Sequence, residues 1–354
     1  LPLRFPGVRV VHAGRDLGTS RARNLALGHV TGAVVVLVHD DIELPPGWLG
    51  PLLAPLDDPD VLGVQPVLVG RDLLVRSAGY AFPDRGLPHE LLRGFPADDA
   101  RRTGGLRFGA VSGAALAVRR GQLLELGGFD EALGGEVADV DVCRRLARRY
   151  GGGFRVAGEV VAVHHDRHPR GEAARADRER YLPARTDDRE AGDDRELWAG
   201  LGFRLLDHDA RATTPEEEQL PPLLRVAQPV LVREARFHTG PRPLRWAIKN
   251  PTPAWSSIWG DIHYADGLAA GLRALGQEVV IDRHETFERP TVRHDDVALL
   301  IRGPEPARPA PEQPTLAWVI SHPDTVTGEE LHGYDAVFAA STGWAARRSR
   351  EWGV

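Results

Sequence analysis

Methionine is absent from the sequence, and there is a single cysteine, Cys143. One cysteine excludes an intramolecular disulfide framework, and nothing indicates an oxidising compartment. Because a translation product starts with methionine, we expect the chain, which begins at Leu1, to be processed or partial.

Long apolar runs are also missing. The longest, from Gly32 to Val38, has the length of a strand, whereas a membrane helix needs about 20 residues. We therefore expect no transmembrane segment. Basic charge is not in excess, since the formal net charge is -6 and the arginines are scattered among acids. This distribution argues against a nucleic-acid partner.

The 354 residues, 42% of them hydrophobic, suffice for two ordinary domains. Strand-like and helix-like segments alternate in the first half, which predicts a Rossmann-like α/β domain over residues 1–166. The apolar run 33–38 lacks polar alternation, so we expect a strand covered on both faces, as in a parallel sheet. The other expected strands are 8–12, 61–69, 111–118 and 154–164, and the expected helices are 19–29, 48–56, 121–126 and 139–150.

Charged residues dominate the next stretch, and residues 167–243 are expected to form a solvated helical appendage or linker. A second α/β unit is predicted over residues 244–354. Its helix, 261–275, has an apolar face and ends at Gly276. Its expected strands are 244–249, 278–282, 296–301, 316–320 and 336–339.

Two acids follow the apolar run, in the loop His39-Asp40-Asp41. Ligands of open α/β sheets bind at the carboxyl ends of strands, and carboxylates hold Mg²⁺ or Mn²⁺. His39 would be an additional ligand suited to Mn²⁺. A metal site that assists departure of a diphosphate is one interpretation. A strand end with solvated acids is the other, and the loop alone does not decide between them.

A second set of acids follows the turn Gly127-Gly128-Phe129-Asp130-Glu131, namely Asp139 and Asp141. Acids near a helix start are favoured by capping and by the helix dipole, so each has a structural explanation. A carboxylate that faces the sheet edge from a helix start is also a suitable general base for an acceptor hydroxyl. His164 and His165 end the last strand of this domain and are candidate ligands at the same edge.

Taken in order, these features resemble the inverting family 2 glycosyltransferases of the GT-A fold. The resemblance covers residues 8–166 and rests on Gly18 to Asn24, Val35 to Asp41, Trp48-Leu49, Ser112-Gly-Ala114, the Gly127 to Glu131 turn, Asp139 to Arg145 and a terminal His. It implies a mixed Rossmann-like sheet and a nucleotide-sugar donor. It also implies that the first strands of the fold precede residue 1, so we expect a truncated domain.

The resemblance also implies roles for particular residues. Asp41 matches the second, metal-binding acid of the family's Asp-x-Asp motif, and His39 stands at its first acidic position. Asp139 matches the general base of the Glu-Asp motif, whose Glu is replaced by Ala138, and His164 matches the late metal or diphosphate ligand. The remaining candidates are Asn24, Asp40 and Arg145 for the donor and its diphosphate, and Asp130, Glu131 and Asp141 on the acceptor side.

The second unit resembles the N-terminal half of a GT-B glycosyltransferase, through Ala247 to Pro253, Trp259 to Gly267 and Gly276 to Val280. The Rossmann half that follows in that family would lie beyond Val354, so we expect an incomplete unit. Asp261 and His263, at the expected helix start, are its candidate site residues. Helix capping by Asp261 and a packed or solvent-facing His263 are the plainer explanation.

The sequence thus predicts metal-assisted sugar transfer, with inversion, from a nucleotide-diphosphate donor to a saccharide or other hydroxyl acceptor. A non-catalytic carbohydrate- or nucleotide-binding module, or an inactive fragment of a bifunctional glycosyltransferase, is the alternative. A metal-dependent hydrolase of nucleotide sugars or phosphates is a third. We expect a cytoplasmic location, because nucleotide sugars are made there and the sequence shows no anchor.

Overall fold

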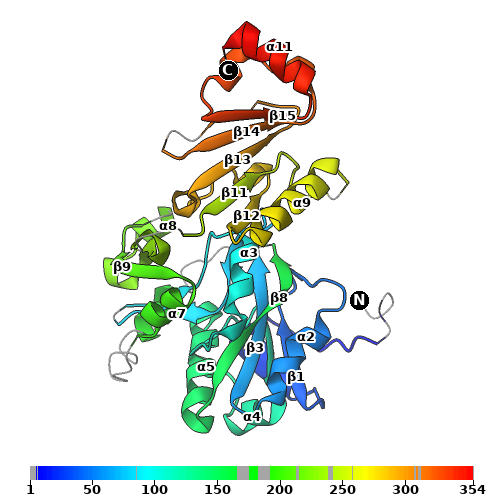
Figure 1. Cartoon of the computed structure of the whole chain (residues 1–354). Coiled ribbons are helices and arrows are strands. Elements are labelled where there is room, and N and C mark those ends of the chain that lie inside the picture. Colours follow the sequence, from blue (N-terminus) through cyan, green and yellow to red (C-terminus); the bar gives the residue numbers. More distant parts are fainter. Residues whose placement is uncertain are drawn as a thin grey trace.

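Two α/β units follow one another along the chain in the computed structural model (Figure 1). The structure describes residues 5, 7–84, 86–165, 175–181, 192–212, 215–237, 242–256, 258–306, 308–309 and 312–353. No helix among these residues is long and apolar enough to cross a membrane.

The first unit is built on a mixed sheet, as predicted, with the strand order β1-β7-β3-β8-β2 and with β4 paired to β3. β3 and β8 are parallel, and the other pairs are antiparallel. A separate short hairpin joins β5 to β6. The strands are β1 (Val34–Val38), β2 (Ile42–Glu43), β3 (Val61–Val69), β4 (Val75–Ser77), β5 (Tyr80–Ala81), β6 (His89–Glu90), β7 (Ala115–Arg119) and β8 (Gly153–His164).

Helices cover both faces of this sheet. The apolar side of α5, including Val142 and Leu146, joins the larger core cluster. Leu52 of α2 packs on the other face, against Val64 and Ala117. The helices of this unit are α1 (Thr19–Leu27), α2 (Leu49–Leu53), α3 (Ala97–Ala100), α4 (Arg120–Glu125) and α5 (Gly135–Tyr150).

The apolar run at 34–38 does form a strand, but the expectation of a strand covered on both faces in a parallel sheet is wrong. β1 is antiparallel to β7 and pairs with no other strand among the described residues. Its side chains are only half-buried, and Val38 is 42% exposed. Residues 8–12, also expected as a strand, have no regular secondary structure. β-branched residues favour a strand, but a strand also needs a neighbour.

Residues 192–212 and 215–237 contribute side chains to the core of the first unit instead of forming only a solvated appendage. Trp198 is 1% exposed and joins the first core, as do Leu201 and Phe203. The elements here are α7 (Asp194–Gly200), β9 (Phe203–Asp209), α8 (Pro215–Glu218) and β10 (Gln228–Arg233), with β9 and β10 antiparallel. The boundary expected at residue 166, and residues 182–191, lie outside the described residues, so the domain limits stay a prediction.

The second unit has a five-stranded, all-parallel sheet of order β12-β11-β13-β14-β15. β13 is buried along its whole length, which agrees with the apolar run in its sequence. The strands are β11 (Arg245–Lys249), β12 (Glu278–Asp282), β13 (Val297–Arg302), β14 (Thr315–Val319) and β15 (Ala336–Ala339), and the helices are α9 (Gly260–Ala274), α10 (Gly328–Leu331) and α11 (Thr342–Trp352).

The two units meet where α3 of the first lies beside β12 of the second (Figure 1). Arg245 donates to both carboxylate oxygens of Asp99 at 2.7 Å and to Asp295 at 3.0 Å. All three side chains are at most 5% exposed. Buried, bidentate charge pairs of this kind fix the orientation of the partners as well as attracting them, so the interface holds the second unit on the first.

Candidate functional site

The turn after β1 is held at the edge of the first sheet by its backbone. The His39 N–H donates to the carbonyl of Ala114 at 2.8 Å, which continues the β1–β7 pairing by one residue. β2 then pairs with the end of β8, where Ile42 faces His164, and the His165 N–H donates to the carbonyl of Asp41 at 2.9 Å. Two residues that are distant in the sequence, Asp41 and His164, are therefore neighbours.

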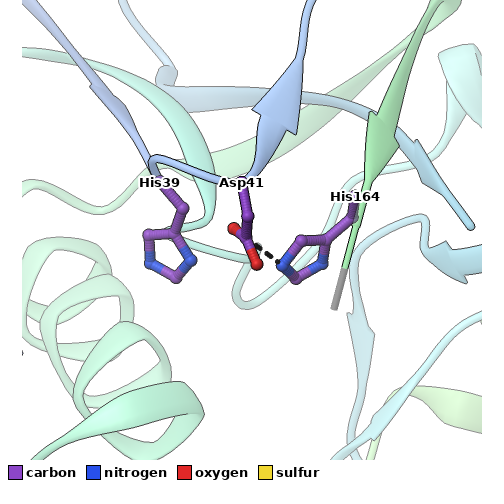
Figure 2. Close-up of side chains that lie close together, drawn as sticks. All are labelled: His39, Asp41 and His164. Atoms are coloured by element: carbon purple, nitrogen blue, oxygen red, sulfur yellow. Dashed lines mark ion pairs between the residues drawn. The ribbon is translucent and has the colours of Figure 1, made fainter. Parts of the chain in front are cut away.

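The carboxylate of Asp41 lies between two imidazoles (Figure 2). Its Oδ1 is 3.4 Å from Nε2 of His164. His39, Asp41 and His164 each present a ligand atom within 4.8 Å of those of the other two. The side chain of Asp41 is 3% exposed and that of His164 is 15% exposed. The structure thus brings together the three residues that were predicted as metal ligands.

His39 has a further partner that the sequence did not indicate. Nη2 of Arg23 lies 2.9 Å from Nε2 of His39. Since a guanidinium can only donate, His39 accepts through Nε2 and carries its proton on Nδ1. Burial lowers the pKa of His39, and the charge of Arg23 lowers it further. Neither nitrogen has a free lone pair in this arrangement, so His39 can bind a metal only after Arg23 has moved.

Arg23 also binds the predicted general base. Its Nη1 is 2.5 Å from Oδ1 of Asp139, and the two side chains are 9% and 5% exposed. Its Nη2 donates to the carbonyl of Gly113 at 3.0 Å. Arg23 therefore links Asp139 to His39. The one sequence signal for this residue was its place beside Asn24 in a segment that carried the family resemblance.

Asp139 lies against Gly113 as well as Arg23. Its Oδ2 accepts the Gly113 N–H at 2.8 Å, and a Cβ on Gly113 would come within 2.3 Å of Oδ1. Only glycine fits at 113 without displacing the carboxylate. The helix start was placed too late, because α5 begins at Gly135 and Asp139 lies beyond the first turn.

Asn24 fastens the Gly127 to Glu131 turn to α1. Its side-chain amide donates to the carbonyl of Phe129 at 2.9 Å and accepts the Phe129 N–H at 2.8 Å. Gly128 has a φ of +77°, and an added Cβ would meet the Asn24 side chain at 2.3 Å. In this structure Asn24 shapes the turn; its role in donor binding stays a prediction.

Four other predicted residues lie in or beside the same turn. Arg145 donates to Asp141 at 2.7 Å and, through both terminal nitrogens, to the carbonyl of Gly128 at 3.0 Å. Asp130 is exposed and accepts the N–H of Ala132 at 2.9 Å. Glu131 is exposed as well and pairs with Arg21 at 3.3 Å. These contacts are structural, and the acceptor-side and diphosphate roles are untested.

A cleft of about 520 Å³ runs between β1 and α1 and reaches Arg23, His39 and Asp40. Its walls are mostly apolar, with Val36 and Val38 of β1 and Ala26 of α1 among them. Asp40 is exposed at its end. The cleft gives a ligand a route along the open edge of β1 to the charged residues.

Asp261 and His263 lie apart from this group, at the start of α9 in the second unit. Burial raises the pKa of Asp261, and the charge of His322 opposes this shift. His263 is exposed. The two residues follow β11, at the carboxyl edge of the parallel sheet.

The model of the family described as "Glycosyl transferase family 2" matches residues 2–118. That segment contains Arg23, the His39 to Asp41 turn and Gly113. The N-terminal region carries a glycosyltransferase family 2 domain.

Two curated proteins resemble parts of the chain. The uncharacterized protein y4gI of Sinorhizobium fredii is 28% identical over 145 residues, which are 39% of this chain and 16% of that protein. Polypeptide N-acetylgalactosaminyltransferase 15 of Mus musculus is 38% identical over 65 residues, which are 18% of this chain and 10% of that protein. The chain thus spans a small part of each relative's length.

Among solved structures, one of GalNAc-T7 with UDP, GalNAc and Mn²⁺ is similar, with a TM-score of 0.37 and 20% sequence identity. The similarity covers 46% of this chain and 33% of that one.

Proposed function

We propose that the family 2 domain transfers a sugar from a nucleotide-diphosphate donor to a hydroxyl acceptor, with inversion and with the help of a divalent cation. The observation that carries the proposal is the convergence of His39, Asp41 and His164, with ligand atoms within 4.8 Å of one another. The cleft beside β1 supplies a place for the donor next to them.

The donor set fits a divalent cation. Asp41 offers a buried carboxylate and His164 an imidazole, a combination that suits Mn²⁺ better than a site of oxygen ligands alone. His39 joins them when Arg23 releases it. When bound, the cation stabilises the charge that develops on the departing diphosphate.

In this proposal the side chain of Arg23 moves when the donor binds. A diphosphate brings about two negative charges into the site, and guanidinium groups bind phosphate bidentately. Movement of Arg23 toward the diphosphate would free Nε2 of His39 and Oδ1 of Asp139 together. Asp139 then accepts the proton of the acceptor hydroxyl as that oxygen attacks the anomeric carbon. Donor binding thereby releases the carboxylate of Asp139 from Arg23, so that it can act as the base.

The test is turnover of the whole chain with a panel of nucleotide sugars and hydroxyl acceptors, after EDTA treatment and with or without Mn²⁺. We expect release of nucleoside diphosphate that requires both acceptor and metal, and a product of inverted anomeric configuration by NMR. Release without any acceptor would instead show a hydrolase, and a retained configuration would contradict inversion.

A second candidate function is ligand binding without turnover, because Asp139 is held by Arg23 and by the Gly113 N–H in this structure. Calorimetric titration with nucleoside diphosphates and Mn²⁺ distinguishes the two. Binding with no transfer to any acceptor favours the module, and transfer excludes it.

For the second unit we propose the acceptor-side half of a GT-B glycosyltransferase. Its all-parallel sheet supports this, as does the position of Asp261 and His263 after β11. β12 and β13 lie on opposite sides of β11, and ligands of such sheets bind where the strand order reverses. Saccharide-induced shifts of the His263 ring signals in NMR, lost in Asp261→Ala, would support the proposal; unchanged spectra would contradict it.

A further inference from the structure

A second group of metal-ligating side chains lies outside the proposed catalytic site. His89, Asp194 and His208 present ligand atoms that lie within 4.8 Å of one another. They come from three separate elements, β6, α7 and β9. None of them is among the residues that line the cleft beside β1.

Two of these three residues are buried. His89 is 3% and Asp194 is 2% exposed, whereas the side chain of His208 is 23% exposed. His208 binds Asp194 through Nε2 at 2.7 Å. Nδ1 of His89 is buried and has no hydrogen-bond partner among the described residues. A buried polar atom with no partner is costly, and such atoms often indicate an ion or a water that belongs in the place.

We propose that His89, Asp194 and His208 bind a divalent metal ion of the zinc type, which fastens β9 and α7 to the first unit. Two imidazoles and one carboxylate are ligands that Zn²⁺ accepts, whereas Mg²⁺ and Ca²⁺ prefer oxygen. The partial exposure of His208 leaves a side from which the ion enters and at which water completes the coordination.

The burial of His89 and the hydrogen bonds of the group agree with this assignment. Burial lowers the pKa of His89 to about 3, with a further contribution from His208. Because Trp198 donates its Nε1–H to Nε2 of His89, that nitrogen carries a lone pair. Asp194 places its Oδ2 2.7 Å from Nε2 of His208, so the carboxylate and the imidazole already face one another. The ion would take the place of the hydrogen bond between His208 and Asp194.

Trp198 gives the proposal a spectroscopic signature. Its Nε1–H donates to Nε2 of His89 at 3.3 Å, which is long for a hydrogen bond. A metal on Nε2 would take the lone pair that Trp198 uses, and a metal on Nδ1 would require the proton to move to Nε2. Both cases break this contact. Metal binding should therefore change the fluorescence of Trp198, which lies almost parallel to the His89 ring.

The location explains what the ion would do. His89 belongs to the first unit, whereas Asp194 and His208 belong to the segment that packs on it. Around them, Phe95, Trp198 and Phe203 form a cluster of ring contacts. An ion bound to all three ligands would close the loop between β6 and β9, which stabilises the folded chain against its unfolded state. Its role would be structural.

The experiment uses the full chain with Asp41→Asn, which removes the carboxylate of the first metal group and weakens that group as a zinc site. After EDTA treatment the chain is titrated with ZnCl2 in competition with a chromophoric chelator. We expect one zinc ion per chain and an increase in Tm with zinc. In this background His208→Asn and His89→Gln should each weaken binding by about 100-fold or more, since even loss of an outer contact to a ligand costs about 10- to 100-fold. His12→Asn, an exposed histidine outside both groups, is the matched control and should bind as before.

Three results would overturn the proposal. The Asp41→Asn chain could bind no zinc, or the His208 and His89 variants could bind it as tightly as their parent. The third result comes from the Trp198→Phe variant, in which all three metal ligands are kept, so the test does not depend on whether a ligand variant folds. The zinc-induced fluorescence change of the Asp41→Asn chain should disappear when Trp198 is replaced while zinc still binds, and persistence of that change would place the ion elsewhere.

Discussion

Arg23 and Asp139 form a buried ion pair between α1 and α5, with Nη1 2.5 Å from Oδ1. The guanidinium of Arg23 also reaches His39. A single side chain therefore holds a predicted metal ligand and the predicted general base in their present positions. The pair stabilises the fold, and in the proposed mechanism it also keeps the base occupied until a donor binds.

Removal of either partner should destabilise the chain strongly. We expect Arg23→Met and Asp139→Asn each to lower the free energy of unfolding by about 3–5 kcal/mol, because each leaves an uncompensated buried charge or polar group. The double variant should lose clearly less free energy of unfolding than the two single variants lose together. Urea unfolding of the four chains measures this coupling, and additive effects would contradict the pairing.

An exposed ion pair of helix α1 provides the control for these four chains. Arg21 pairs with Glu131, but both side chains are about half exposed, at 53% and 52%. Exposed pairs contribute roughly 0–1 kcal/mol, so Arg21→Met should scarcely change the unfolding curve. A loss as large as that of Arg23→Met would mean that helix α1 itself, and not the buried pair, is sensitive to substitution.

Gly113→Ala adds a single methyl group and should nevertheless lower both stability and transfer activity. The new methyl group would lie 2.3 Å from Oδ1 of Asp139, so the carboxylate must move. Overpacking of this kind costs about 1–3 kcal/mol, and transfer activity should fall with the displaced base. Gly121→Ala is the matched control, because its Cβ meets nothing within 4 Å in α4. That control should be neutral or more stable by about 0.5–1 kcal/mol. Equal activity of the two variants would argue against a role for the position of Asp139.

Arg245 should determine whether the two units unfold together. Arg245→Met would leave Asp99 buried without its cation, whereas Asp295 would keep Arg289 at 2.6 Å, and we expect a cost of about 3–5 kcal/mol. We expect the thermal transition of this variant to split into two. Arg242 is 31% exposed and lies 3.8 Å from Asp296, so Arg242→Met should change stability by less than about 1 kcal/mol. A single, unshifted transition in Arg245→Met would contradict the assigned interface.

Cys143 should be unreactive in the folded chain. It is fully buried on α5, and burial raises the pKa of its thiol. Because the thiolate is the reactive form, labelling by a thiol reagent should require unfolding and proceed at the rate of opening. Ser349→Cys, at an exposed position of α11, provides a thiol that labels at once. Rapid labelling of Cys143 without denaturant would contradict the packing of α5.

The sequence predicted most elements of regular structure, because apolar periodicity and glycine positions are local signals. Strand 61–69 and the helix at 260–274 were found almost at their observed limits. It also predicted that His164 lies with Asp41, since both follow strands that end at one edge of the sheet. The assignment of roles to these residues stays a prediction.

Other features depend on contacts between distant parts of the chain, which have no signal in the local sequence. The pairing of Arg23 with Asp139 spans 116 residues and requires α1 to pack beside α5. The half-exposed state of β1 is set by its neighbours and not by its own valines. Trp198 lies in a stretch so rich in charge that its burial was not foreseen, and with it the grouping of His89, Asp194 and His208 was missed.

In the proposed mechanism, Asp41 holds the cation that assists sugar transfer. The most direct measurement is a Mn²⁺ titration of transfer by the EDTA-treated chain and by Asp41→Asn, with Asp60→Asn, an exposed acid on the loop before β3, as control. We expect metal-dependent transfer to fall by about 100-fold or more in Asp41→Asn, because a metal ligand is lost, and to stay unchanged in Asp60→Asn. Full metal-dependent transfer by Asp41→Asn would contradict this role of Asp41.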